Sequence, residues 1–300
     1  MSHFAVMVIG ENVEQQLQPF HEFECTGTND QFVQNVDITA NVQSAIDEGE
    51  TLEGALDYYG LGERTIEDES QAETQGDQAS HMYGYAVVKD GKLIKAVDRT
   101  NPNKKWDWWT IGGRWSGFLK LKAGRAGLLG KRGALGSCAD DGPGRADVVR
   151  KGDIDFDGMR DAAGQKAADR WATAAAASNG ETWLTWDHVR DVLHAGDIAA
   201  ARDAYNAQEV MKAVAKALGN PWDGVDEYLT PRDQYIQQAR DGATVLYAVL
   251  KDGEWIARGD MGWFGFSNDH ASESDWNRKV NELLDGLPDD TTITVVDCHI

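Results

Sequence analysis

The chain has 300 residues, of which 41% are hydrophobic, enough to bury the core of one large domain or two ordinary ones. No apolar run approaches the roughly 20 residues that a membrane span needs, and the first ten residues lack the basic flank of a signal peptide. We therefore expect a globular protein in the cytoplasm, away from membranes. The three cysteines, Cys25, Cys138 and Cys298, lie far apart, which favours reduced thiols over a disulfide framework.

The net charge of −21 is unevenly distributed along the chain. Residues 1–82 carry −16, residues 83–152 carry +9, and residues 153–300 carry −14. Bulk double-stranded DNA would repel so acidic a molecule, whereas its basic middle could hold a single anion. The basic middle could equally be paired with the acidic ends of the same chain.

The first part of the chain, residues 1–62, is predicted to supply a strand and helices to an α+β domain. Residues 3–9 are apolar enough for a central strand, and residues 41–59 carry apolar side chains at helical spacing. Residues 63–82 are acidic, with Ile66 as their one large aliphatic side chain, which predicts a mobile loop.

The middle of the chain is predicted to begin with a hairpin and to end with a loop. Within residues 83–122, Asp90-Gly91 lies between two apolar-rich segments and predicts a type I′ turn, with a tryptophan-rich element following the hairpin. Residues 123–152 are basic and glycine-rich, which predicts a flexible loop.

Residues 153–240 have the spacing of successive helices and are interpreted as a helical insertion. Residues 241–300 add a hairpin, a helix and a terminal strand. The segment YAVLKDGEWI at 247–256 repeats YAVVKDGKLI at 85–94, so the two hairpins are predicted to be related. The expected fold class is α+β. Its central antiparallel sheet would join residues 1–10, the two hairpins as ferredoxin-like elements, and residues 291–299.

The segment WDWWTIGGRW at residues 106–115 is the most unusual stretch of the chain. Indoles offer large flat surfaces, an arginine can stack or bind an anion, and paired glycines let backbone approach closely. We predict that indoles stack on a ligand, that Arg114 holds a phosphate, and that Asp107 orients Arg114 or reads a base edge. The predicted ligand-binding set is Trp106, Asp107, Trp108, Arg114, Trp115 and the facing Trp263. The alternative is that these tryptophans are core anchors.

A metal site is a second hypothesis, because potential ligands lie near the ends of strands that could be neighbours. Alternation along a terminal strand puts Asp297 and His299 on one face and Cys298 on the other. His21, Asp297 and His299 could therefore hold zinc, with Cys25 or water completing the site. Two further possibilities are nucleophilic catalysis by Cys25 and acid–base hydrolysis of a phosphodiester.

The hydrolytic possibility would pair a histidine with basic side chains that hold the phosphate. Arg114 together with Lys104 or Lys105 would supply that charge.

Five segments together resemble an uncharacterised family of proteins from tailed phages and some actinobacteria. They are MSHFAVMVIG at the start, HEFECTG at 21–27, NPNKKWDWWTIGGRW at 101–115, MGWFG at 261–265, and VDCHI at the end. The resemblance implies an accessory protein that acts in the cytoplasm of a bacterial host, in host takeover or counter-defence. It implies no particular reaction.

Taken together, these features predict a phage accessory protein that binds an anionic nucleotide-type ligand through a pocket rich in tryptophan and arginine. The first alternative is an acidic inhibitor that resembles DNA in charge and binds a host defence protein. The second is a phosphodiester hydrolase that depends on a metal or on histidine.

Overall fold

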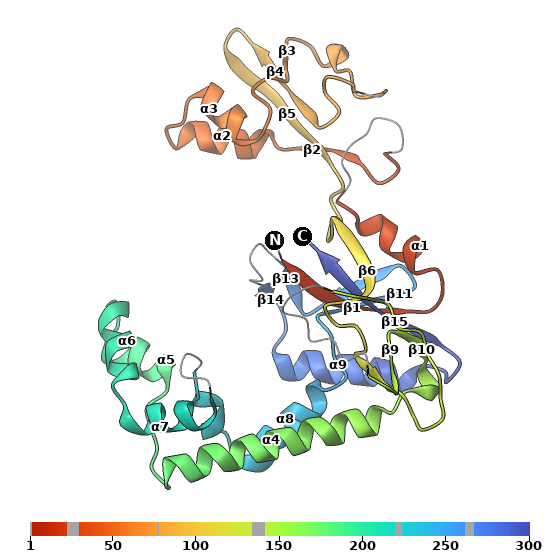
Figure 1. The fold of residues 1–300 in the computed structure, drawn as a ribbon. Helices are drawn as coiled ribbons and strands as arrows, with labels where there is room; N and C mark the ends of the chain where they lie inside the picture. Colours follow the sequence, from red (N-terminus) through yellow and green to blue (C-terminus); the bar gives the residue numbers. More distant parts are fainter. Residues whose placement is uncertain (1, 23–29, 77, 134–141, 220–223, 262–266) are drawn as a thin grey trace.

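The computed structural model describes residues 2–22, 30–76, 78–133, 142–219, 224–261 and 267–300. Figure 1 shows a central part that contains the first and last strands, a second part with its own sheet above it, and a helical part extending from below it. The chain contains both helices and strands, and the strands form several sheets, so the protein is a mixed α and β structure.

The central sheet is built around the two ends of the chain. Its main path is, in order, β12 (Glu254–Ala257), β11 (Ala248–Lys251), β1 (His3–Ile9), β15 (Thr292–His299), β6 (Trp108–Gly113) and β8 (Lys131–Arg132). Strand β10 (Val148–Arg150) pairs with the first half of β15, beside the half that pairs with β6. The sheet is mixed, because β1 and β11 are parallel, as are β6 and β8, while the other pairs are antiparallel.

Both faces of the central sheet are apolar over most of their area. Helix α9 (Glu273–Gly286) covers one face, where Trp276 and Val280 join a buried cluster with Met7 and Val295. The opposite face holds Phe4, Val6, Val8, Val296 and Cys298 in a second cluster with Trp106. This alternation confirms the strand assignments at both ends of the chain, since neighbouring side chains of a strand point to opposite faces.

The prediction that both related hairpins belong to the central sheet is wrong. The hairpin of β11 and β12 lies there, but the hairpin of β4 (Gly84–Lys89) and β5 (Lys92–Thr100) belongs to a separate four-stranded sheet. The hairpins do share their turn, because Asp90 and Asp252, like the glycine after each, have positive φ. A turn sequence fixes the local pairing of two strands and leaves open the sheet they join.

The separate sheet has the order β2 (Gln34–Asp37), β5, β4 and β3 (Thr65–Ile66). Helices α2 (Thr39–Asp47) and α3 (Leu52–Tyr58) contribute Val42 and Leu56 to a core shared with strands β4 and β5. The acidic segment predicted as a mobile loop contains β3 and a 3-10 helix (Glu69–Gln71). Glu69 anchors that segment, because its carboxylate accepts hydrogen bonds from Tyr85 and Lys95.

The basic glycine-rich segment predicted as a flexible loop instead supplies strands. Strand β8 pairs with β6, β9 (Arg145–Ala146) pairs with β7 (Leu119–Lys120), and β10 pairs with β15. These strands could not be predicted from the segment alone, because they are short and glycine-rich and each pairs with a strand far away in the sequence.

Residues 151–242 are mainly helical, and two long helices of this region lie side by side (Figure 1). A buried cluster beyond them contains Trp183, Tyr205 and Tyr228. The described helices are α4 (Phe156–Ser178), α5 (Trp186–His188), a π-helical turn (Val189–Leu193), α6 (Ile198–Asn206), α7 (Glu209–Ala217) and α8 (Arg232–Gly242), with 3-10 helices at Lys151–Asp153 and Asp226–Leu229. Across the described residues, no helix is long and apolar enough to cross a membrane.

Asp147 is a buried carboxylate that fastens the turn after β6 to the segment before β8. It is fully buried and accepts hydrogen bonds from Ser116 Oγ (3.1 Å), Gly117 N (2.6 Å) and Gly130 N (2.7 Å). A buried charge of this kind is tolerated only when hydrogen bonds satisfy it. Asp147 therefore fixes where the turn after β6 lies relative to strand β8.

We expect Asp147→Ala to lower the free energy of unfolding by at least about 3 kcal/mol, because each buried donor left without an acceptor costs about 1–3 kcal/mol. Urea unfolding monitored by circular dichroism measures the change. The control is Asp169→Ala on the exposed side of α4, which should stay within about 0.5 kcal/mol of the wild type. Equal stability of the two variants would contradict the role of Asp147.

Candidate functional site

The site lies where the face covered by α9 changes from apolar to polar. Ile293 and Val295 on β15 belong to the cluster under α9, and the next two residues on that face are Asp297 and His299. Antiparallel pairing sets His3 of β1 directly opposite His299. The two ends of the chain therefore place polar side chains together at one end of the sheet.

Asp297 holds together the two sides of this site. It is only 1% exposed, and its Oδ1 accepts a hydrogen bond from His3 Nδ1 at 2.8 Å. Its Oδ2 accepts another from the backbone N–H of Arg114, also at 2.8 Å. Each carboxylate oxygen thus has one donor, and the pair of bonds fixes the carboxylate plane, the His3 ring and the start of the loop after β6.

A second histidine–carboxylate pair lies beside the first. His299 Nδ1 is 2.7 Å from Asp107 Oδ1 and 2.9 Å from Oδ2. The His299 ring stacks on Trp108, with ring centroids 5.0 Å apart and planes 16° apart, and it meets the His3 ring edge-on at 4.9 Å. Asp107 and His299 together support the Trp108 indole, which remains 43% exposed.

Two adjacent glycines bring the loop after β6 against Asp297. Gly112 and Gly113 both have positive φ, at 78° and 55°. A Cβ at Gly113 would lie 2.3 Å from the Cβ and the Oδ2 of Asp297. The close approach predicted for this glycine pair is therefore confirmed, and at Gly113 it is made to Asp297.

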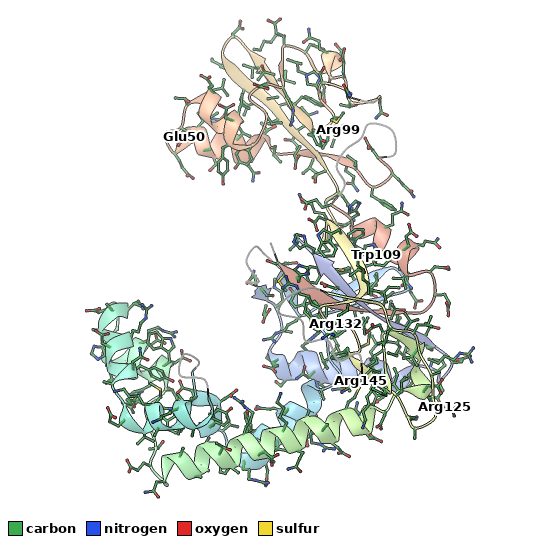
Figure 2. All side chains as sticks on the ribbon, viewed as in Figure 1. Glu50, Arg99, Trp109, Arg125, Arg132 and Arg145 are labelled. Carbon is green, nitrogen blue, oxygen red and sulfur yellow. The ribbon has the colours of Figure 1, made fainter. Side chains whose placement is uncertain are left out.

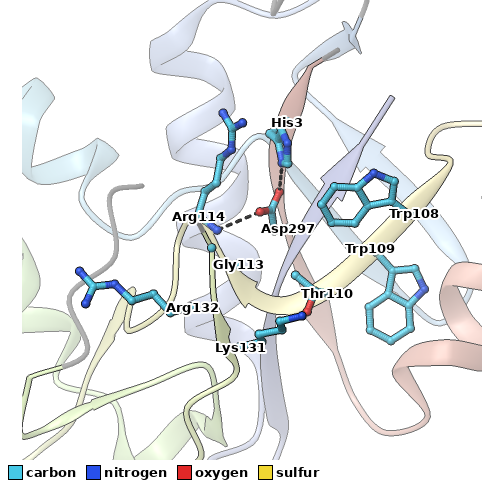
Figure 3. A pocket seen from close by; sticks show the side chains of 10 residues that line it. His3, Trp108, Trp109, Thr110, Gly113, Arg114, Lys131, Arg132 and Asp297 are labelled. Atoms are coloured by element: carbon cyan, nitrogen blue, oxygen red, sulfur yellow. Dashed lines mark hydrogen bonds and ion pairs between the residues drawn. The ribbon is translucent and has the colours of Figure 1, made fainter. Parts of the chain in front are cut away.

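These elements line a pocket of about 640 Å³ (Figure 3). Trp108, Arg114 and the His3–Asp297 pair come from the parts already described, and strand β8 adds Lys131 and Arg132 along the edge of β6. The full lining is His3, Trp108, Trp109, Thr110, Gly113, Arg114, Lys131, Arg132, Gly133 and Asp297. The pocket combines an exposed indole, three cationic side chains and a histidine held by a buried carboxylate.

The basic residues of the middle segment differ in what they contact. Many pair with carboxylates of the acidic flanks, namely Lys95, Arg99, Lys104, Lys105, Lys120, Arg125 and Lys151. Figure 2 shows Arg99 in the part with the separate sheet and Arg132 in the central part. Over the described ranges, the structure gives no carboxylate partner to Arg114 or Lys131, both in the pocket lining. Their positive charge is available to a ligand.

The predicted ligand-binding residues are only partly brought together. Trp108 and Arg114 line the pocket, whereas Trp106 is 6% exposed and donates its Nε1–H to Leu17 O in the opposite core. Trp115 packs against the core under α9. The expectation that Trp106 and Trp115 face the ligand is therefore corrected, because their indoles serve as the core anchors of the alternative interpretation.

Asp107 does not have the first of its two predicted roles, the orientation of Arg114. Its carboxylate binds His299 and does not orient Arg114, whose backbone N–H is held by Asp297 instead. Trp263 lies outside the described residues.

The predicted zinc ligands are not assembled around one point. Asp297 binds His3, His299 binds Asp107, and His21 stacks on Trp106 with ring centroids 4.3 Å apart. Within the described ranges, no group of three or more histidine, cysteine, aspartate or glutamate side chains is placed to hold a metal ion. Cys25, proposed as the fourth ligand or as a nucleophile, lies outside those ranges.

Cys298 faces away from the pocket, as its alternation with Asp297 and His299 predicts. Its side chain is in the core of the opposite face, and burial, with smaller effects of nearby carboxylates, raises the pKa of the thiol well above its usual value. A thiol of this kind stays protonated and unreactive at neutral pH.

Lys104 and Lys105, expected to assist Arg114, are engaged elsewhere. Lys104 pairs with Glu22 at 2.8 Å and Lys105 with Asp260 at 3.1 Å, and neither lines the pocket with Arg114. Lys131 and Arg132 are the basic side chains that line the pocket with Arg114. The sequence does offer a sign of this arrangement, because Lys131 and Arg132 stand between Gly130 and Gly133. Glycines are common where two backbone segments pack closely.

His3 is the residue of the site that the sequence did not indicate. It begins a strand whose other residues on the same face, Ala5 and Met7, are apolar and buried. Its partner Asp297 is almost three hundred residues away. The sequence predicts that the first and last strands share a sheet, but it does not predict which of their residues lie opposite one another. With that register, His3 falls opposite His299.

Comparison with known protein families, with curated proteins and with solved structures found no match to this chain.

We expect Gly113→Ala to destabilise the protein more than Gly124→Ala. Both glycines have positive φ, which costs an alanine about 1–2 kcal/mol, but a Cβ at Gly124 meets no atom within 4 Å. At Gly113 the added methyl group must also displace Asp297. Thermal unfolding of the two variants measures the difference, and equal losses would show that Asp297 gives way at no cost.

Proposed function

We propose that the pocket binds an anionic nucleotide-type ligand. The observation that carries this proposal is that Arg114 and Lys131, which have no carboxylate partner among the described residues, line the same cavity as the exposed indole of Trp108. An arginine can bind a phosphate through two parallel hydrogen bonds, and a tryptophan offers a surface on which a base stacks.

The size of the pocket supports a ligand of this class. A volume of about 640 Å³ falls within the roughly 300–1,000 Å³ that is usual for small-molecule sites. The cations lie on β8 and the loop after β6, while Trp108 lies at the other end of β6 (Figure 3). In this proposal the phosphate lies at the cationic end of the pocket and the base on the indole.

The supporting side chains favour a preformed site. The Trp108 indole is stacked on His299, whose ring is held by Asp107, and the Arg114 backbone is held by Asp297. A ligand therefore loses less of its binding energy to the ordering of side chains than it would in a mobile loop.

The biological setting is part of the same proposal. The resemblance to proteins of tailed phages suggests an accessory role in host takeover or counter-defence, inside the bacterial cytoplasm. Binding of a host or signalling nucleotide would suit such a role, since removal of a nucleotide needs a pocket and no other machinery.

The test is titration of the protein with ADP by isothermal calorimetry, with adenosine and inorganic phosphate as separate ligands. Arg114→Ala and Lys131→Ala should each weaken ADP binding by about 10-fold or more, because a hydrogen bond to a charged group is worth about 1.5–3 kcal/mol. ADP should bind more tightly than either fragment, since it uses both ends of the pocket.

The matched control is Arg125→Ala, from the same basic segment. Arg125 pairs with Asp153 at 3.2 Å and lies apart from Arg132 in Figure 2, so its removal should leave ADP affinity unchanged. The proposal fails if ADP does not bind, or if all three variants bind it as the wild type does. Binding of a host protein by a variant that lacks Arg114 would favour the acidic inhibitor instead.

A further inference from the structure

We propose that the same pocket hydrolyses nucleotide phosphodiesters, with His3 as the general base and Asp297 as its positioning residue. This inference rests on the proposed nucleotide binding and adds a reaction to it. It starts from an arrangement that binding alone does not require, a pocket-lining histidine whose Nδ1 is held by a carboxylate that is 1% exposed.

The hydrogen bond to Asp297 determines which nitrogen of His3 can act. The carboxylate accepts a hydrogen bond from Nδ1–H, so the neutral ring carries its free lone pair on Nε2. No hydrogen bond from a described residue occupies Nε2, and the His3 ring lines the pocket. A buried carboxylate that fixes the tautomer and stabilises the imidazolium is the arrangement by which histidine acts as a base in hydrolytic enzymes.

The carboxylate is itself fixed, which separates this pair from an ordinary surface contact. Asp297 Oδ2 accepts the backbone N–H of Arg114, and Gly113 leaves no free space beside it. The same residue thus sets the positions of the base and of the first residue that would hold the phosphate (Figure 3). Such coupling places a general base beside the atom that reacts.

The reaction that fits these groups is hydrolysis by water. His3 Nε2 takes a proton from a water molecule, and the water oxygen forms a new bond to phosphorus. The bond between phosphorus and one ester oxygen breaks, and its electron pair leaves with that oxygen. The leaving oxygen takes a proton from solvent, the imidazolium returns its proton to solvent, and the products are a phosphomonoester and an alcohol.

The cations have a defined part in this step. Negative charge grows on the phosphoryl oxygens as water adds, and Arg114 and Lys131 lie in the lining to stabilise it. A diester carries one negative charge, so it opposes the approach of the water oxygen less than a doubly charged monoester does. The proposed substrate is therefore a diester with a base that can stack on Trp108.

The test uses the p-nitrophenyl ester of thymidine 5′-phosphate, which releases yellow p-nitrophenolate on hydrolysis. The wild type should turn it over, and His3→Gln should lower kcat by about 100-fold or more, the usual contribution of a general base. Affinity for ADP should stay within a few-fold of the wild type, because the cations and the indole remain in place.

The matched control is His270→Gln. His270 also pairs with a carboxylate, Asp260 at 2.8 Å, but it does not line this pocket, so activity should be unchanged. Asp297→Asn should lower kcat by a larger factor than it raises KM, because the one amide oxygen can still accept the Arg114 N–H while His3 loses its carboxylate partner. That difference separates positioning of the base from a general loss of structure. The circular dichroism of each variant is compared with that of the wild type.

The outcomes separate the two proposals. Binding of ADP by the wild type without release of p-nitrophenolate would overturn hydrolysis and leave the binding site standing. Absence of both would overturn both. Full activity in His3→Gln would also overturn the inference, whereas loss there with retention in His270→Gln would support it.

Discussion

The buried carboxylate of Asp297 is the interaction on which the pocket depends. An ionised carboxylate away from water is costly unless hydrogen bonds compensate it, and this one has a donor on each oxygen. One donor comes from the first strand and the other from the loop after β6, while Asp297 itself is in the last strand. A single side chain therefore links three segments that are distant in the sequence.

A second buried carboxylate, Asp147, has a similar role at the turn after β6. It gathers donors from the turn after β6 and from Gly130, which immediately precedes β8. Asp297 thus positions His3 and Arg114, and Asp147 positions the strand that supplies Lys131. The pocket rests on polar contacts at the end of a sheet whose remaining area is apolar on both faces.

Ion pairs within the chain explain part of its uneven charge distribution. Part of the basic middle is paired with carboxylates of the acidic flanks, which agrees in part with the interpretation that the chain neutralises its own charge. Arg114 and Lys131 give the pocket a positive charge, although the molecule as a whole has a net charge of −21. Such a molecule can attract a small anion at short range and still repel a long polyanion.

Local patterns in the sequence predicted local structure well. Alternation placed Asp297 and His299 on one face and Cys298 on the other, and the two Asp-Gly pairs predicted two hairpin turns. These features depend on neighbours within a few residues, where the chemistry of the backbone decides the outcome.

Long-range pairing could not be predicted in the same way. The hairpin after Tyr85 joined a separate sheet, and the segment that contains Lys131 turned back to extend the central one. Trp106 and Trp108 are two residues apart, yet one is buried in the core under β1 and the other is exposed at the pocket. Trp108 is the first residue of β6 and pairs with His299, whereas Trp106 precedes β6 and forms an isolated bridge with His21. The alternation of side chains along β6 therefore does not extend to Trp106.

The central claim is that a nucleotide binds between Trp108 and the cations of the pocket, and nuclear magnetic resonance tests it most directly. The indole N–H signal of Trp108, assigned by its disappearance in Trp108→Phe, and the amide signals of Arg114 and Lys131 are followed during addition of ADP. The account predicts that these three signals shift together and saturate at one concentration, while the buried indole of Trp106 changes little. Binding that leaves Trp108, Arg114 and Lys131 unshifted and moves signals elsewhere would contradict it.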